Sequence, residues 1–225
     1  MLDRRKEQLL TCIIEEYIDS AEPVGSSLLA ERFGLSGATL RNEMRELEEI
    51  GLLSHPHTSA GRVPTEAGYR YYIQHLMKSS APSKRMGQEL EQISENEPTK
   101  IERLKATARL IADETKNAVI VVWNNDSLYY TGLSHLFAQP EFQDVTLTIS
   151  MSAVFDHFEH RLGDIYNAVD PGTTKILIGA ENPLGSECGT VLVRDAHNNL
   201  FAIVGPIRKD YGEQSGIVEF LQGMV

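Results

Sequence analysis

Apolar side chains near the N-terminus recur at steps of three and four residues, which is the spacing of one helix face. They occupy one side of a helix of about five turns and are Leu9, Leu10, Ile13, Ile14, Tyr17 and Ile18. The helix is expected to end within the stretch AEPVG, because Pro23 and Gly25 both disfavour helical backbone. The pattern therefore predicts one long amphipathic helix at the start of the chain.

Two shorter helices are predicted next, with a tight turn between them. Ser26 is a good cap for the segment SSLLAERF, which Gly34 closes. Ser36 is expected to cap a third helix that runs to Gly51. A helix, a tight turn and a second helix in this order predict a helix-turn-helix unit.

A short hairpin is predicted after the third helix. The segment LLSH has the pattern of a strand, HTSAGR that of a loop, and RVP that of a returning strand. We interpret this hairpin as the wing of a winged helix-turn-helix domain. Thr65 can cap a further helix, EAGYRYYIQHLM, which would complete a first domain over residues 1–78.

The rest of the chain mixes helices with strands. The polar stretch KSSAPSKRMGQ contains Pro82, so residues 79–98 are interpreted as a linker. Helices are predicted over residues 99–116, SAVFDHFEHRLGDIYNAV and the closing segment GIVEFLQGM. Two paired strands are predicted at NAVIVVW and SLYYTG, and three further strands at KILIGAE, GTVLVRDA and LFAIVGPI. Residues 99–225 are therefore expected to form an α+β domain on one sheet, which gives the whole chain an α+β fold class.

The third predicted helix has one apolar side and one small or polar side. Its buried stripe consists of Leu40, Met44 and Leu47. Its opposite side carries Ala38, Asn42, Arg45 and Glu49, with Thr39 and Arg41 at the flanks. A recognition helix has this polarity, because its N-terminal residues meet the base edges. Arginine pairs with guanine and asparagine with adenine, each pair giving roughly 1–3 kcal/mol of discrimination, while methyl groups suit thymine.

Hydroxyl, guanidinium and backbone N–H groups around this helix suit the phosphate oxygens of DNA. The candidate DNA-binding residues are Ser26, Ser27, Ser36, Thr39, Arg41, Asn42, Arg45, Thr58, Ser59 and Arg62. Plainer interpretations remain open. The helix face can be a solvated surface with an Arg45–Glu49 pair. The wing can be an ordinary hairpin loop, and a winged helix can serve only protein contact.

Composition narrows the class of protein. The 225 residues are 41% hydrophobic and 24% charged, which is ordinary for a globular protein with one large or two small domains. No apolar run approaches the ~18 residues of a membrane span, and the N-terminal segment lacks the pattern of a signal peptide, so we expect a cytoplasmic protein. The distant cysteines Cys12 and Cys188 are interpreted as buried thiols in a reducing compartment.

The charge of the chain is acidic, with a net value of −11. This value weighs against DNA binding through a broad basic field. Residues 1–78 alone carry nine Lys and Arg against twelve Asp and Glu. If the chain binds DNA, the positions of its charges must therefore matter more than their sum.

Long ordered blocks of sequence occur toward both ends of the chain. The most specific blocks in the first domain are ATLRNEM, HTSAGRVPT and GYRYY, and later ones are GLSHLFAQPEF, IGAEN and VGPIRKDYG. Together they resemble the HrcA family of heat-inducible transcription repressors. The resemblance implies a homodimer that binds an inverted-repeat operator before chaperone genes and represses them. It also implies the chaperonin GroEL as a partner that supports the active repressor.

The resemblance further implies a GAF-like effector domain with an inserted dimerisation domain. The insert and part of the GAF-like core are expected between NAVIVVW and GLSHLF, where this chain is short. Residues 99–225 are therefore interpreted as a reduced GAF-like effector and dimerisation domain. Ser27 stands where a basic residue is expected from the family, which predicts one weaker phosphate contact.

Few residues of the second domain point to chemistry. His157 and His160 are three residues apart, which is a spacing that metal ligands use, but no third ligand has clear spacing. Arg208 and Lys209 after Gly205 suggest an anion site, although a turn at a strand end explains the pattern equally well. No catalytic motif is present, so we expect no enzyme activity, no cofactor and no metal. The alternative function is a ligand- or protein-sensing winged-helix regulator of other genes.

Overall fold

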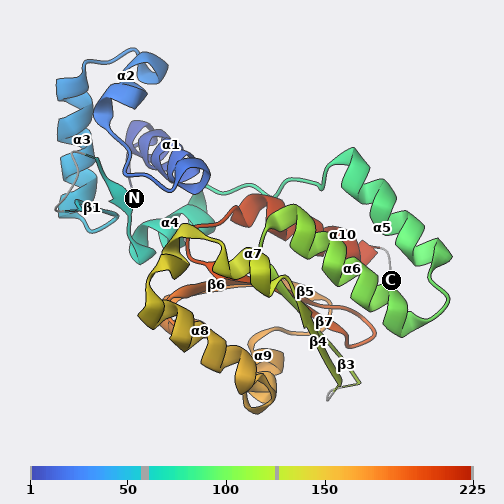
Figure 1. The fold of residues 1–225 in the computed structure, drawn as a ribbon. Coiled ribbons are helices and arrows are strands. Elements are labelled where there is room, and N and C mark those ends of the chain that lie inside the picture. Colours follow the sequence, from blue (N-terminus) through green and yellow to red (C-terminus); the bar gives the residue numbers. More distant parts are fainter. Residues whose placement is uncertain (1, 57–60, 125–126, 224–225) are drawn as a thin grey trace. The chain divides into compact units, whose positions relative to one another are not determined.

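The computed structural model describes residues 2–56, 61–124 and 127–223. The chain divides into two compact units, Met1–Lys78 and Ser79–Val225, called here the N-terminal and C-terminal units. Figure 1 shows the elements of both units coloured along the sequence.

The described residues of the N-terminal unit form four helices and a two-stranded hairpin. Its elements are α1 (Arg4–Ser20), α2 (Ser26–Phe33), α3 (Gly37–Glu49), β1 (Leu53–Ser54), β2 (Val63–Pro64) and α4 (Glu66–His75). Strands β1 and β2 are antiparallel, with Leu53 opposite Pro64. An isolated bridge between Val24 and Arg62 attaches the hairpin to the segment between α1 and α2. This is the predicted winged helix-turn-helix architecture.

The core of the N-terminal unit forms where the apolar stripes of its helices meet. Leu9 and Ile13 of α1 and Leu40 and Leu47 of α3 are fully buried. Each such side chain contributes roughly 1.5–3 kcal/mol by leaving water. Tyr17, at the far end of the α1 stripe, is only half-buried. The predicted helical periodicity therefore holds best in the middle of α1.

Local signals set the turn between α2 and α3. Gly34 ends α2 in the left-handed region with a φ of 61°, which glycine adopts without a steric penalty. The Ser36 hydroxyl caps α3 by accepting a hydrogen bond from the Thr39 backbone N–H, as predicted. At the start of α2 the prediction was wrong, because Gly25 occupies the cap position and Ser26 is the first helical residue. A residue with extended backbone is needed there, and Gly25 has it.

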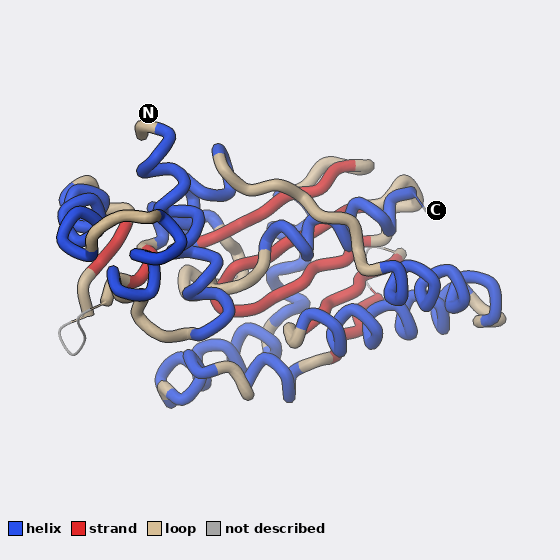
Figure 2. The backbone as a smooth tube through the Cα atoms, turned by 90° about the horizontal axis from the view of Figure 1, so that it is seen from above, coloured by secondary structure: helices blue, strands red, loops and turns tan. Residues whose placement is uncertain are grey.

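The C-terminal unit is built on one five-stranded antiparallel sheet of order β4-β3-β7-β6-β5. Its strands are β3 (Ala118–Trp123), β4 (Ser127–Thr131), β5 (Thr173–Ile178), β6 (Cys188–Arg194) and β7 (Leu200–Pro206). Its helices are α5 (Lys84–Asn96), α6 (Lys100–Thr115), α7 (Leu133–Phe137), α8 (Val145–Asp156), α9 (Leu162–Ala168) and α10 (Tyr211–Gly223), with 3₁₀ turns at Pro140–Gln143, Phe158–Arg161 and Gly179–Glu181. Figure 2 shows the strands of the sheet and the helices of the chain.

Helices cover both faces of this sheet. One face buries Ile120, Ala202 and Leu192 against side chains of α7, α8 and α9. The opposite face contacts α6 through β3 and α10 through β6, and α5 packs on α6. The predicted pairing of β3 with β4 is confirmed, with Val121 opposite Tyr129. The predicted fold class is confirmed, with a winged helix-turn-helix unit followed by an α+β unit on one sheet.

Two segments differ from the sequence-based prediction. The stretch 79–98 is not a plain linker, because most of it is α5, which buries Met86 and Leu90. The single helix predicted over SAVFDHFEHRLGDIYNAV is broken, because α8 ends before His157 and a 3₁₀ turn precedes α9. Among the described residues, no helix is long and apolar enough to cross a membrane.

Candidate nucleic-acid interface

Helix α3 presents a solvent-exposed face that matches the predicted recognition face. Arg41, Asn42 and Arg45 are exposed, and Thr39 is half-exposed. The reverse side is buried through the apolar stripe already described. The structure therefore brings four of the predicted residues to one surface of one helix, free to meet another molecule.

The N-terminus of α2 adjoins this face. Nη1 of Arg41 donates to Oγ of Ser26 over 3.4 Å. Gly37 lies between the two side chains, since a Cβ there would be 3.5 Å from Nη1 of Arg41 and 3.7 Å from Oγ of Ser26. Ser26 is buried, with 8% of its surface exposed, whereas Ser27 is exposed. The buried hydroxyl of Ser26 thus positions Arg41, and the exposed hydroxyl of Ser27 remains available to a phosphate.

Ser36 and Thr39 form a second pair at the start of α3. Oγ of Ser36 accepts from the Thr39 backbone N–H at 3.1 Å, and the two hydroxyl oxygens are 2.9 Å apart. Both hydroxyls are therefore engaged within the helix cap. The pair fixes the first turn of α3.

Arg62 does not point out from a wing tip, so this part of the sequence-based prediction was wrong. Only 19% of its side chain is exposed, and its Nε donates to Oε2 of Glu48 at 2.8 Å. Its Nη1 also contacts Nδ1 of His55. A buried cation needs such partners, and the acid lies on the neighbouring α3. Thr58 and Ser59, the other predicted wing contacts, lie outside the described residues.

Close backbone packing holds the base of the wing. A Cβ at Gly61 would be 2.5 Å from the carbonyl oxygen of Pro23, a distance that real side chains do not reach. The backbone N–H groups of Val24 and Arg62 each donate to the carbonyl of the other at 2.9 Å. The SAGR motif therefore needs its glycine so that the wing can lie against the segment before α2.

The acidic residues of α3 are paired with cations from other elements. Glu43 is buried, with 6% of its side chain exposed, and forms an ion pair with Arg5 of α1. Glu46 contacts Lys6 at 2.8 Å. The carboxylate of Glu46, and secondarily that of Asp3, raises the pKa of Lys6.

With Glu48 bound to Arg62, these pairs balance three of the four acids on α3. The fourth, Glu49, lies 3.6 Å from Arg45 in an exposed pair, which water and salt weaken. Arg41 is thus the cation of α3 that faces solvent without an acidic partner among the described residues.

Sequence reasoning missed these ion pairs. Glu43 falls beside the apolar stripe in the helical projection, and Arg5 and Lys6 lie in the first helix, about 40 positions earlier. The available signal was the placement of acids at 43 and 46 next to buried positions. Only the packing of α1 on α3 shows which cations meet them.

The candidate sites of the C-terminal unit do not assemble. The rings of His157 and His160 stack with centroids 6.2 Å apart, and no group of three or more potential metal ligands occurs in the described part of the chain. Arg208 donates to Glu141 and Gln139, and Lys209 is buried and donates to the carbonyls of Gly189 and Ile203. The anion site considered at these two cations is therefore excluded by their internal partners.

Comparison with known proteins finds relatives of this sequence in one family. The family described as HrcA protein C terminal domain matches residues 77–214. The heat-inducible transcription repressor HrcA of Carboxydothermus hydrogenoformans is 40% identical over 125 residues, which cover 54% of this chain and 37% of the relative. That of Acetivibrio thermocellus is 57% identical over 81 residues, 35% of this chain and 23% of the relative. The chain therefore spans only 23–37% of the length of these two relatives.

One solved structure has the same fold. It is described as a hypothetical protein, and its TM-score to this chain is 0.69 at 16% sequence identity. The superposition covers 100% of both chains. At this identity the likeness concerns the fold alone.

Proposed function

The chain belongs to the HrcA family, and on that premise we propose that it is a DNA-binding transcriptional repressor of heat-shock genes. Its relatives are named heat-inducible transcription repressors. The N-terminal unit binds the operator, and the C-terminal unit serves as the effector and dimerisation domain. Helix α3 lies in the major groove, and the hairpin β1–β2 lies beside it.

One observation carries this proposal: the basic and amide side chains of α3 face solvent while three of its four acids are paired with cations from other elements. Arg41 and Asn42 are adjacent and exposed at the N-terminal half of the helix. That half is the part of a recognition helix that reaches the base edges. Arg41 is suited to guanine and Asn42 to adenine, because each offers a bidentate hydrogen-bonding group. The ion pairs of Glu43, Glu46 and Glu48 with cations of the same unit reduce the negative charge of α3, and a merely solvated helix face does not require them.

The contacts divide into base-reading and phosphate-binding groups. We assign Arg41, Asn42 and the Thr39 methyl group to base reading. Arg45 and Ser27 bind phosphates on either side. Ser26, which is buried, and Ser36, which caps α3, hold these residues in place. The phosphate role expected for Arg62 is withdrawn, since its guanidinium already holds Glu48.

The functional unit is a homodimer on an inverted repeat. A two-fold protein matches a palindromic operator, and each half-site alone binds weakly. The net charge of −11 keeps binding to random DNA low, which improves discrimination. An interaction with GroEL follows from the family and stays a prediction, to be checked by co-elution of the two proteins.

Fluorescence anisotropy tests the proposal with two labelled duplexes. One carries the inverted repeat that precedes the chaperone genes of the host, and the other carries the same bases in scrambled order. Tight, salt-dependent binding to the repeat alone, at two chains per duplex, is expected. Equal weak binding to both duplexes would contradict a sequence-specific repressor, and one chain per duplex would contradict the dimer.

A further inference from the structure

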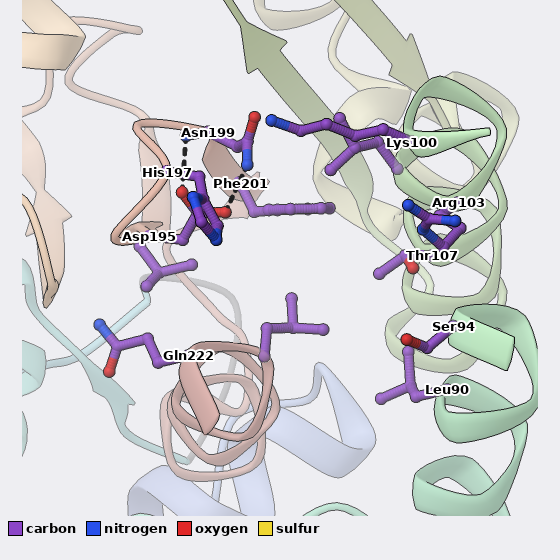
Figure 3. Close-up of a pocket in the computed structure, with 13 residues that line it drawn as sticks. Leu90, Ser94, Lys100, Arg103, Thr107, Asp195, His197, Asn199, Phe201 and Gln222 are labelled. Atoms are coloured by element: carbon purple, nitrogen blue, oxygen red, sulfur yellow. Dashed lines mark hydrogen bonds between the residues drawn. The ribbon is translucent and has the colours of Figure 1, made fainter. Parts of the chain in front are cut away.

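A cavity of about 610 Å³ lies inside the C-terminal unit. Its walls come from α5, α6, α10 and the two strands β6 and β7 with their connecting turn (Figure 3). Small-molecule sites commonly have volumes of roughly 300–1,000 Å³. One wall of the cavity is formed by α5, the helix that the sequence analysis interpreted as part of a linker.

The inner lining of the cavity is apolar. It consists of Leu90, Leu104, Val193, Phe201 and Leu221, each with 8% or less of its surface exposed. In Figure 3 the ring of Phe201 extends from the strand side toward the α6 side of the cavity. Such a lining favours the apolar body of a ligand over a fully hydrated ion.

Two buried polar groups on this lining lack partners. The carboxylate of Asp195 accepts from Asn199 twice, at 2.7 Å from the backbone N–H and at 2.5 Å from Nδ2. These bonds fix the amide of Asn199, whose residue is only 2% exposed, and leave its Oδ1 without a hydrogen-bond partner in the described residues. Nε2 of Gln222 is also buried and likewise has no hydrogen-bond partner in the described residues. Both atoms are themselves buried, so they lie behind the lining and do not face the space of the cavity.

Cations stand on the α6 side of the same cavity. Lys100 is exposed at the first turn of α6, and Arg103 follows one turn later. Arg103 uses one Nη1 N–H on the carbonyl of Glu97 at 3.0 Å, which anchors the side chain and leaves further guanidinium donors. Figure 3 shows the Lys100 side chain extending toward Asn199 across the cavity.

The charge balance of the lining favours an anion. Asp195 is its acidic residue, and both oxygens of that carboxylate are already occupied by Asn199. Lys100 and Arg103 therefore outnumber the acid and are not neutralised by it. His197 adds a further group that can carry positive charge when protonated.

We propose that this cavity binds a small anionic amphiphile, a molecule with an apolar body and one carboxylate. The carboxylate is held by Lys100 and Arg103, and the apolar body fills the space between Leu104, Phe201 and Leu221. The inference goes beyond the proposed repressor function and does not depend on it, because every residue involved belongs to the C-terminal unit.

Isothermal titration calorimetry of the full chain without DNA tests this site, with octanoate as the probe and octanamide as its neutral counterpart. Octanoate is expected to bind, and octanamide to bind at least about tenfold more weakly, because the amide lacks the charge that the two cations recognise. Absence of octanoate binding, or equal binding of both probes, would overturn the proposal. Either result leaves the DNA-binding proposal untouched, since no DNA is present.

Variants locate the binding. Lys100→Gln with Arg103→Gln is expected to weaken octanoate binding about tenfold or more. The matched control, Lys105→Gln with Arg109→Gln, removes two charges from the same helix beside Tyr129, outside the cavity, and is expected to leave binding within about twofold of the parent. Equal loss in both double variants would mean that only overall charge matters, which contradicts the site.

A third variant fills the cavity. Thr107, half-buried on the α6 wall, is replaced by tryptophan. Octanoate binding is expected to disappear while the circular dichroism spectrum and the melting temperature stay at or above those of the parent. Binding that persists in a folded Thr107→Trp chain would place the probe elsewhere and refute the assignment.

Discussion

Nε of Arg62 donates to Oε2 of Glu48 at 2.8 Å, which ties the returning strand of the hairpin to the C-terminal half of α3. The pair joins residues 14 positions apart in the chain, and both side chains are less than one third exposed. The wing is therefore held against the helix through a charge pair, and the Val24–Arg62 backbone bridge holds the same point from the other side.

Arg62→Ala is expected to destabilise the N-terminal unit by about 1–3 kcal/mol, because it leaves the half-buried Glu48 carboxylate without its partner. Chemical denaturation of the chain measures the loss. Glu48→Ala and the double variant complete a mutant cycle, and a coupling energy near zero would show that the two residues do not stabilise each other.

The salt dependence of DNA binding is expected to stay unchanged in Arg62→Ala, since this guanidinium contacts Glu48 and no phosphate.

Arg41→Ala and Asn42→Ala are each expected to cost roughly 1–3 kcal/mol of operator binding and to relax the preference for one base. The reason is that both side chains are exposed on the face of α3 that we assign to the bases. Anisotropy titrations against the operator and single-base variants measure both effects.

Arg32→Ala serves as the control for these variants, because it also removes an exposed arginine from the N-terminal unit. Arg32 lies on α2 and faces Glu15 of α1 at 3.6 Å, away from the α3 face. The operator affinity of the Arg32→Ala variant should match that of the parent chain. If Arg41→Ala and Asn42→Ala also bind as the parent does, α3 is not the recognition helix.

Gly68→Ala is expected to destabilise the N-terminal unit by about 1–3 kcal/mol through overpacking. A Cβ at Gly68 would lie 2.2 Å from the carbonyl oxygen of Leu52, so either α4 or the start of the hairpin must move. Gly37→Ala is the matched control, since its Cβ meets nothing closer than 3.5 Å. Melting temperatures of the two variants separate steric conflict from the general effect of replacing glycine, and equal values would refute the close packing.

Lys209 gives the C-terminal unit a pH-dependent stability. Burial lowers the pKa of Lys209 from 10.5 to about 7. Between these values the unfolded chain holds a proton that the folded chain has released, so the contribution of Lys209 to stability is expected to rise as pH rises from 7 toward 10. The contribution of one group is at most about 1.4 kcal/mol per pH unit and levels off below pH 7.

Lys209→Met should flatten this pH profile, and Lys175→Met should keep it. Lys175 is exposed on β5 and controls for the loss of a charge. Denaturation at several pH values between 7 and 10 measures the slopes. A variant at Lys209 with the slope of the parent would show that this amine is charged in the folded chain throughout the range.

The sequence was sufficient where a pattern is local. The α3 stripe of Leu40, Met44 and Leu47 follows from helical periodicity, and the exposed positions of Arg41 and Asn42 follow from the same geometry. Cap chemistry placed the start of α3 at Ser36. These features depend on residues within one or two helical turns, which a single sequence displays.

The sequence was insufficient where a side chain's role depends on a distant partner. Arg62 has the residue type and chain position expected of a wing contact with DNA, but its guanidinium contacts Glu48 and His55 in the folded chain. Helix α5 was hidden because Gly87 and the preceding Pro82 resemble loop signals, while its burial depends on packing against α6. The cavity near Asn199 likewise combines three helices and two strands, so no window of the sequence contains it.

The pairing of Glu43, Glu46 and Glu48 with cations inside the N-terminal unit has a consequence for how such proteins are recognised. A genome survey that ranks chains by isoelectric point would discard this one as too acidic for DNA. Such a survey counts carboxylates that are already paired with cations of the same unit. Ranking by the exposed charge of individual helix faces would retain it, and would also retain other acidic regulators built in the same way.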